Sequence, residues 1–140
     1  MSELAKLRGE HVQLLKIARQ LEELIAQPNP PPQIQLFDLR SQFSSTLIAH
    51  LKAEDWVLYP LLLASPDRQI SSTAHEFCEE MGGLAASYIE YCEKWNADAI
   101  SADWAGYCKD SRQLIDTLTI RITRENRELY PLLEKLDRAA

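Results

Sequence analysis

The stretch His50-Leu51-Lys52-Ala53-Glu54 places an imidazole and a carboxylate four residues apart, and Arg121-Ile122-Thr123-Arg124-Glu125 is its counterpart later in the chain. The similarity continues downstream, where Leu58-Tyr59-Pro60-Leu61-Leu62 follows the first stretch and Leu129-Tyr130-Pro131-Leu132-Leu133 follows the second. On a helix, side chains four residues apart share a face, one turn apart. Two copies of such a unit favour a metal site inside a helix bundle, although the second copy has Arg121 in place of the histidine.

The pattern of apolar residues predicts an all-α protein, in which residues 1–140 form one domain folded as an antiparallel up-down-up-down four-helix bundle. Clean apolar/polar alternation and Asn-Gly or Asp-Gly hairpin signals are absent. Pro60 is expected to bend the second helix rather than end it, and Ser101 is expected to cap the fourth. The helices are expected over about residues 2–26, 35–64, 68–95 and 101–136.

Composition and charge exclude several classes of function. The net charge of −6 argues against binding to nucleic acid or to an anionic membrane surface, because both require a basic face. No apolar run approaches the roughly 18 residues of a membrane span. The start, Met1-Ser2-Glu3-Leu4, lacks the basic and apolar segments of a signal peptide. We therefore expect a cytoplasmic protein without a membrane partner.

The three cysteines, Cys78, Cys92 and Cys108, form an odd set without C-x-x-C spacing. This argues against a disulfide framework and against a zinc ribbon. The simplest interpretation is that they are small buried side chains, since free cysteine is often buried. The alternative is a redox-active thiol, for which Cys78 is the best candidate because it lies three residues from His75.

Polar residues interrupt the expected apolar faces of all four helices. The face of the second helix is expected to hold Leu36, Leu39, Phe43, Leu47, His50, Glu54, Val57 and Leu61. The face of the third is expected to hold His75, Cys78, Gly82, Ala85, Ile89 and Cys92. Over the four helices, the interrupting residues are His11, His50, Glu54, His75, Arg121 and Glu125. Burying these imidazoles and carboxylates together is costly unless a divalent cation satisfies them, and such ligands suit iron, manganese and zinc.

The chain resembles the hemerythrin-like, or HHE cation-binding, domains over nearly all of its length. In that family a His on helix one, a His-x-x-x-Glu on helix two, a His on helix three and a second His-x-x-x-Glu on helix four hold a non-haem di-iron centre. Both Glu motifs are commonly followed by a Leu-Tyr-Pro-like segment. The resemblance implies metal ligands at His11, His50, Glu54, His75 and Glu125. Tyr59, Tyr130 and Cys78 are candidate neighbours of the metal.

Arg121 is the first departure from the family pattern. Arginine has no lone pair to give a metal, and a guanidinium about 5 Å from a divalent cation repels it by roughly 6–7 kcal/mol at an effective dielectric constant of about 20. We favour a salt bridge from Arg121 to Glu125, Glu54 or Glu79 in place of a second metal, which leaves one ion or none. The alternatives are an outward-bent Arg121 beside a di-metal site, or a close Arg121 that holds an anion or a metal-bound oxygen species.

Glu79 is the second departure, because oxygen-carrying hemerythrins place a further His at this position. We interpret Glu79 as a surface charge. An unusual oxygen ligand and a partner of Arg121 are the alternatives.

The resemblance implies an iron-binding protein that binds or senses O2, NO or iron through a His/Glu site, with zinc or manganese as other candidate metals. Two other functions remain open. One is a metal-poor regulatory or interaction domain, and the other is a non-haem iron oxidase, peroxidase or nitric-oxide-handling enzyme. A homodimer through an exposed aromatic residue, such as Trp56 or Trp104, is a further expectation.

Overall fold

The computed structural model describes residues 2–139, with side chains described for residues 3–135, and every regular element in this part of the chain is helical. The helices form four long rods, and a short helix, α6 (Ala97–Ala102), connects the third rod to the fourth. In chain order the rods are α1 (Ser2–Ile25); α2 (Gln33–Lys52), π-helical η1 (Ala53–Leu58) and α3 (Tyr59–Leu63); α4 (Arg68–Met81) and α5 (Leu84–Lys94); and α7 (Trp104–Arg124), π-helical η2 (Glu125–Leu129) and α8 (Tyr130–Ala139).

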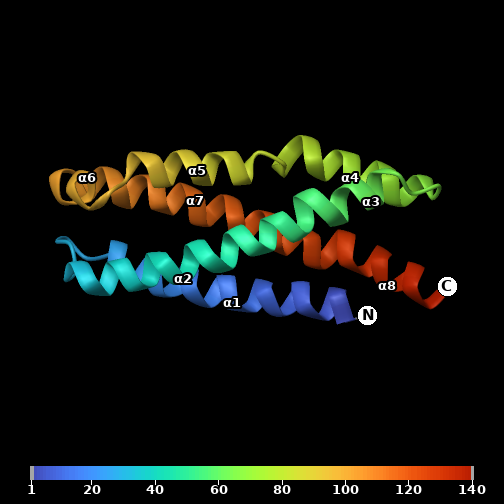
Figure 1. Ribbon diagram of the computed structural model, residues 1–140, viewed down its shortest axis with the longest axis horizontal. Helices are drawn as coiled ribbons and strands as arrows, with labels where there is room; N and C mark the ends of the chain where they lie inside the picture. Colours follow the sequence, from blue (N-terminus) through green and yellow to red (C-terminus); the bar gives the residue numbers. More distant parts are fainter. Residues whose placement is uncertain (1, 140) are drawn as a thin grey trace.

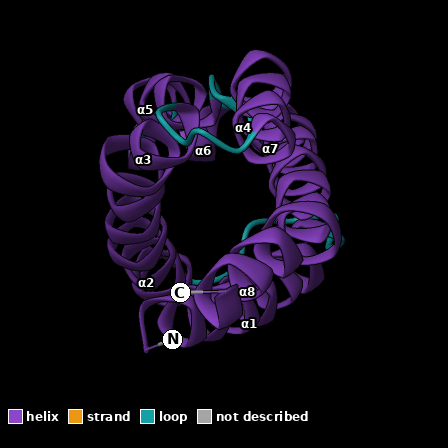
Figure 2. Ribbon diagram, turned by 90° about the vertical axis from the view of Figure 1, so that its right-hand side faces the viewer, coloured by secondary structure: helices purple, strands orange, loops and turns teal. Residues whose placement is uncertain are grey.

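Successive rods run in opposite directions, which makes the protein an antiparallel up-down-up-down four-helix bundle, as predicted (Figure 1). Seen along its length, the bundle places the four rods around a common axis (Figure 2). None of the described helices is long and apolar enough to cross a membrane.

Two apolar clusters fill the bundle, one on each side of a polar layer. One cluster, toward α6, includes Leu14, Leu47 and Leu118, and the other, toward the chain termini, includes Leu7 and Leu129. Apart from Ser111, which lies within the first cluster, the buried polar residues of the first, second and fourth rods fall between members of the two clusters: His11, His50, Glu54, Arg121 and Glu125. The polar layer is therefore enclosed by apolar packing at both ends.

The two π-helical segments correspond to each other in the two copies of the repeated unit. Each begins at or next to the buried Glu, and the backbone N–H groups of Tyr59 and Tyr130 donate to the carbonyls of Glu54 and Glu125, five residues back. The wider turn precedes a proline in both copies, as π adjustments commonly do where proline removes a helical donor. The second rod thus continues past Pro60, as expected.

The wider turn also rotates the following residues, so part of the predicted face of the second helix is wrong. Val57 and Leu61 are 66% and 68% exposed, and Tyr59 and Leu62 are buried instead. A periodicity of 3.6 residues cannot anticipate an inserted residue within a π turn.

A continuous third helix over residues 68–95 was also expected, and the structure divides it at Gly82-Gly83. The N–H of Gly82 donates to the Cys78 carbonyl at 2.9 Å, and a Cβ atom at Gly82 would lie 2.4 Å from the same oxygen. Gly82 is therefore required by close approach of the backbone, whereas a Cβ atom at Gly83 would meet nothing within 4 Å.

Substituting Gly82 with alanine is expected to destabilise the protein by about 1–3 kcal/mol, because backbone must move to admit the methyl group. Gly83→Ala is the matched control and is expected to be neutral or to stabilise by about 0.4–1 kcal/mol, since its backbone angles suit alanine. Urea unfolding followed by circular dichroism measures both. Equal effects at the two positions would contradict the close-approach explanation.

The fourth rod begins later than predicted. Ser101 lies inside α6, and Asp103 caps α7 by accepting a hydrogen bond from the Gly106 N–H at 2.9 Å. Asp is as good a cap as Ser, and the short helix before it was not visible in the apolar pattern.

Candidate metal centre

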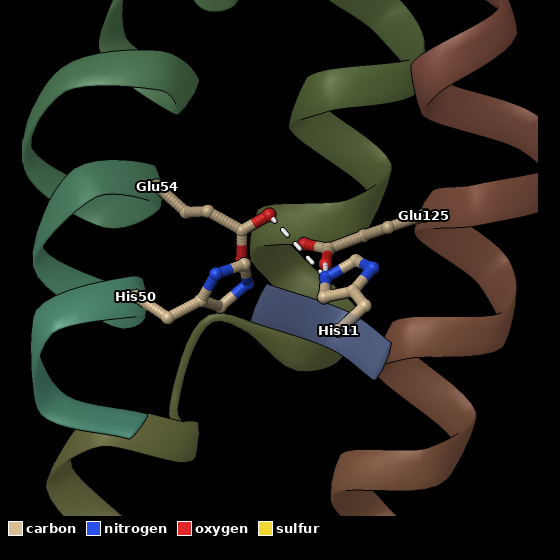
Figure 3. Close-up of side chains that lie close together, drawn as sticks. All are labelled: His11, His50, Glu54 and Glu125. Atoms are coloured by element: carbon tan, nitrogen blue, oxygen red, sulfur yellow. Dashed lines mark ion pairs between the residues drawn. The ribbon is translucent and has the colours of Figure 1, made fainter. Parts of the chain in front are cut away.

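Four side chains converge in the polar layer from four helical segments: His11 on α1, His50 on α2, Glu54 on η1 and Glu125 on η2 (Figure 3). Each is at most 1% exposed. One ligand atom from each residue lies within 4.8 Å of the others. Two imidazoles and two carboxylates at this spacing form a donor set suited to a divalent first-row metal.

Both imidazoles are held by an oxygen acceptor on their outer nitrogen. His50 Nδ1 lies 2.7 Å from Glu10 Oε1, and His11 Nδ1 lies 2.9 Å from Asn126 Oδ1. An oxygen acceptor at Nδ1 favours the tautomer with hydrogen there, which leaves the lone pair of a neutral ring on Nε2. This is the outer arrangement typical of metal-binding histidines, because it fixes both the ring orientation and the ligating nitrogen.

Two buried atoms in the layer have no hydrogen-bond partner: His50 Nε2 and Glu125 Oε1. His50 Nε2 lies 3.0 Å from Glu54 Oε1, and Glu125 Oε1 lies 3.1 Å from His11 Nε2, but the groups are not aligned for hydrogen bonding. Unsatisfied buried polar atoms are rare in proteins. A cation would satisfy both, since each presents a lone pair to the centre of the cluster.

The tyrosine that follows each glutamate pairs with the glutamate of the other copy. Tyr59 donates its hydroxyl to Glu125 Oε2 at 2.6 Å, and Tyr130 donates to Glu54 Oε2 at 2.6 Å. The two copies are thereby tied together across the bundle. Each tyrosine occupies one carboxylate oxygen, so the other oxygen, Oε1, faces the cluster.

Arg121 fills the side of the layer next to α4. Its guanidinium donates to Glu54 Oε1 at 3.2 Å, to Glu125 Oε2 at 3.1 Å and to Asp55 Oδ1 at 2.6 Å. Its fourth acceptor is the Met81 carbonyl, at 3.2 Å. Because α4 ends at Met81, this carbonyl is one of those that a helix end leaves without an intrahelical partner. The side chain is only 2% exposed, so Arg121 points inward rather than outward.

Charge and burial act together on the ionisable groups of the layer. Burial alone would raise the pKa of Glu54, but the close contact with His50 and the charge of that ring, followed by the charge of Arg121, lower it to about 2. For Glu125, burial raises the pKa and, with repulsion from Glu54, outweighs the contributions of His11 and Arg121. Burial disfavours the charged form of His50, yet its contacts with Glu54 and Glu10 raise its pKa overall. Glu54 is therefore the more strongly anionic of the two carboxylates.

The prediction that His75 belongs to the buried layer is wrong. Its side chain is 67% exposed, and its Nε2 lies 3.0 Å from Glu79, which is 69% exposed. Glu79 is thus a surface charge, as interpreted, and it does not contact Arg121. The buried face of the third rod is instead made of Ile70, Ala74, Phe77, Met81, Leu84 and Tyr88. It is rotated by one residue from the predicted face, and Ile89 is 54% exposed as a result.

Cys78 lies at the edge of the layer and is partly buried. Burial, followed by the charge of Asp55, raises the pKa of its thiol, and Arg121 opposes this only in part. A raised pKa reduces the thiolate population and disfavours a reactive thiol.

Sequence reasoning missed three residues that orient the layer: Glu10, Asp55 and Asn126. Asp55 and Asn126 occupy the same position in the two copies, directly after Glu54 and Glu125. That correspondence is the signal that could have identified them. Glu10 offers no signal beyond its place beside His11.

Comparison with known protein families gives a match over nearly the whole chain. The sequence model described as the hemerythrin HHE cation binding domain matches residues 2–133. This span contains all four clustered side chains and Arg121. No curated protein and no solved structure matches the chain.

Proposed function

The chain belongs to the hemerythrin HHE cation-binding domain family, and we propose that it binds a single non-haem iron ion. The proposed ligands are His11, His50, Glu54 and Glu125. We further propose that the protein uses this ion to bind or sense O2 or NO. The observation that carries the proposal is the pair of unpartnered buried atoms, His50 Nε2 and Glu125 Oε1, in a cluster of four ligand atoms.

Arg121 supports one ion rather than two. Its guanidinium lies between Glu54 and Glu125 on the α4 side. It neutralises the carboxylate charge that a second cation would otherwise neutralise. No imidazole reaches this side, because His75 is on the surface. The guanidinium fills the space between the two carboxylates on this side, so a second divalent ion would have to displace it.

A ferrous ion held by these four residues would supply the chemistry for binding O2 or NO. The protein contributes two neutral imidazoles held by Glu10 and Asn126, and two carboxylates whose second oxygens are occupied by tyrosines. The apolar clusters on both sides exclude water from the layer. Arg121 adds a fixed positive charge and N–H donors at its edge.

Metal analysis of the purified protein after anaerobic loading with ferrous iron tests this function. We expect about one iron per chain and a new visible absorption band on addition of NO. Two irons per chain would overturn the role given to Arg121. A colourless protein without iron would instead favour a metal-poor interaction domain. In that case the guanidinium of Arg121 would neutralise the buried carboxylates without a metal.

The outer contacts of the histidines give a second test. Replacing Glu10 with glutamine is expected to weaken metal binding by about 10–100-fold, because a neutral amide is a weaker acceptor for the Nδ1–H of His50 than the charged carboxylate. Glu23→Gln is the matched control on the same helix, where the side chain is exposed. Competitive titration against a chelator measures the affinity. Equal affinity of the two variants would contradict a role for Glu10 in orienting the ligand.

A further inference from the structure

The second rod is apolar on its outward face as well as on its core face. Of the ten large apolar residues that are exposed in the described part of the chain, seven lie on this rod: Ile34, Phe37, Ile48, Trp56, Val57, Leu61 and Leu63. The rod lies at the edge of the bundle, with its outward face turned away from the other three (Figure 2). A helix that is apolar on both faces is normally covered on both.

Two of these apolar residues, Ile34 and Ile48, lie on a regular seam of exposed residues along α2. Ile34, Asp38, Ser41, Ser45, Ile48 and Lys52 are spaced alternately by four and three residues, and all are exposed. Such spacing is that of the contact line in helices that pack along their length. Trp56 continues the line into η1 and is 72% exposed, with Lys52 Nζ 5.5 Å from its ring centre.

We propose that this seam is the interface of a homodimer, in which the second rods of two copies pack antiparallel across a two-fold axis at Ser45. Asp38 and Lys52 each lie seven residues from Ser45, so the axis places each Asp38 opposite Lys52 of the partner subunit. Ile34 and Trp56 each lie eleven residues from Ser45 and meet in the same way. A two-fold interface must be complementary to itself, and this register achieves that for the Asp38–Lys52 and Ile34–Trp56 pairs.

The middle of the seam suits close approach of two helices. Ser41 and Ala49, four residues on either side of Ser45, bring small side chains to the crossing point. A groove of about 640 Å³ runs beside them, lined by Phe37, Ile48 and other residues of this face. It provides room for the larger side chains of the second copy.

Charge favours a second copy of this chain over a basic or acidic partner. Asp38 has no ion-pair partner within the described residues, and Arg40, the other charge near the seam, is turned toward the Trp95 carbonyl at 2.6 Å. Among the described residues, the seam therefore carries one acid and one base that form no ion pair, although the chain has a net charge of −6. Trp104, the other aromatic candidate for an interface, donates its indole N–H to the Gln27 carbonyl at 3.0 Å and is occupied within the chain.

Sedimentation velocity of the metal-free protein tests the interface without reference to the metal site. We expect the protein to be dimeric at about 100 μM. Ile48→Arg is expected to raise the dissociation constant of the dimer at least about tenfold. Ile120→Arg is the matched control, because Ile120 is similarly exposed but lies on α7. A monomeric wild type, or equal effects of the two substitutions, would overturn the proposal.

A charge-swap experiment tests the register. Asp38→Lys and Lys52→Asp should each be monomeric under conditions where the wild type dimerises, because each variant places like charges opposite each other twice. An equal mixture of the two variants should restore dimers, since both pairs then become complementary. A mixture that stays monomeric, or single variants that dimerise like the wild type, would overturn the antiparallel arrangement. All of these side chains are exposed, and circular dichroism confirms that each variant is folded.

Discussion

Replacing Arg121 with methionine is expected to lower the free energy of unfolding of the metal-free protein by about 3–5 kcal/mol, the cost typical of removing one partner from a buried ionic network. Arg121 is 2% exposed and bonds to Glu54, Glu125 and Asp55. Without it, the two buried glutamates face each other with no cation between them. Methionine fills much of the same volume, so the loss reports charge more than packing.

Arg124→Met is the matched control for this substitution. Arg124 lies three residues further along the chain, and its ion pairs with Glu76, Glu80 and Glu128 lie at the surface. Exposed ion pairs contribute little, so we expect a loss below about 1 kcal/mol. Urea unfolding in the presence of a chelator measures both variants. Similar losses would show that Arg121 does not compensate the buried carboxylates.

Metal should reverse much of the Arg121→Met defect. A divalent cation would take over the neutralisation of Glu54 and Glu125, and ligand binding stabilises the native state by mass action. Repeating the unfolding with ferrous iron or zinc is therefore expected to restore stability more strongly in the variant than in the wild type. An equal gain in both proteins would argue against competition between Arg121 and a cation.

Glu54→Gln is expected to weaken metal binding by more than about 100-fold, beyond the effect of an outer-contact residue. The low pKa of Glu54, about 2, means that this carboxylate is anionic at neutral pH, and glutamine removes the charge while retaining the shape. Arg121 keeps Glu125 and Asp55 as partners, so the stability cost should be smaller, about 1–3 kcal/mol.

The chain contains its own control for this result, because His75 and Glu79 repeat the His-x-x-x-Glu spacing on the surface of α4. Glu79→Gln should leave the metal affinity unchanged. Calorimetric titration with zinc compares the two variants. Equal losses would contradict the assignment of the site to the buried motif, and no loss in either variant would remove Glu54 from the ligand set.

The amino-acid sequence predicts the helical bundle, the direction of its rods and the layer in which polar residues meet. Duplicated motifs and periodic apolar residues carry this information, because burial of one face is the dominant force that places a helix. His11, His50, Glu54 and Glu125 could be identified for this reason. Each interrupts an apolar face whose neighbours on both sides are strongly apolar.

The orientation of the third rod and the contacts of Arg121 depend on how the four rods pack together. The third rod has apolar residues on two adjacent faces, so packing against the other rods selects Ala74 over His75 by a rotation of one residue. Arg121 has a long flexible side chain whose position depends on acceptors from η1, η2 and the broken end of α4 at Met81. Those acceptors come together only when the four rods pack into the bundle. They hold Arg121, which stands at the position of the missing histidine, as a buried cation beside the candidate metal site.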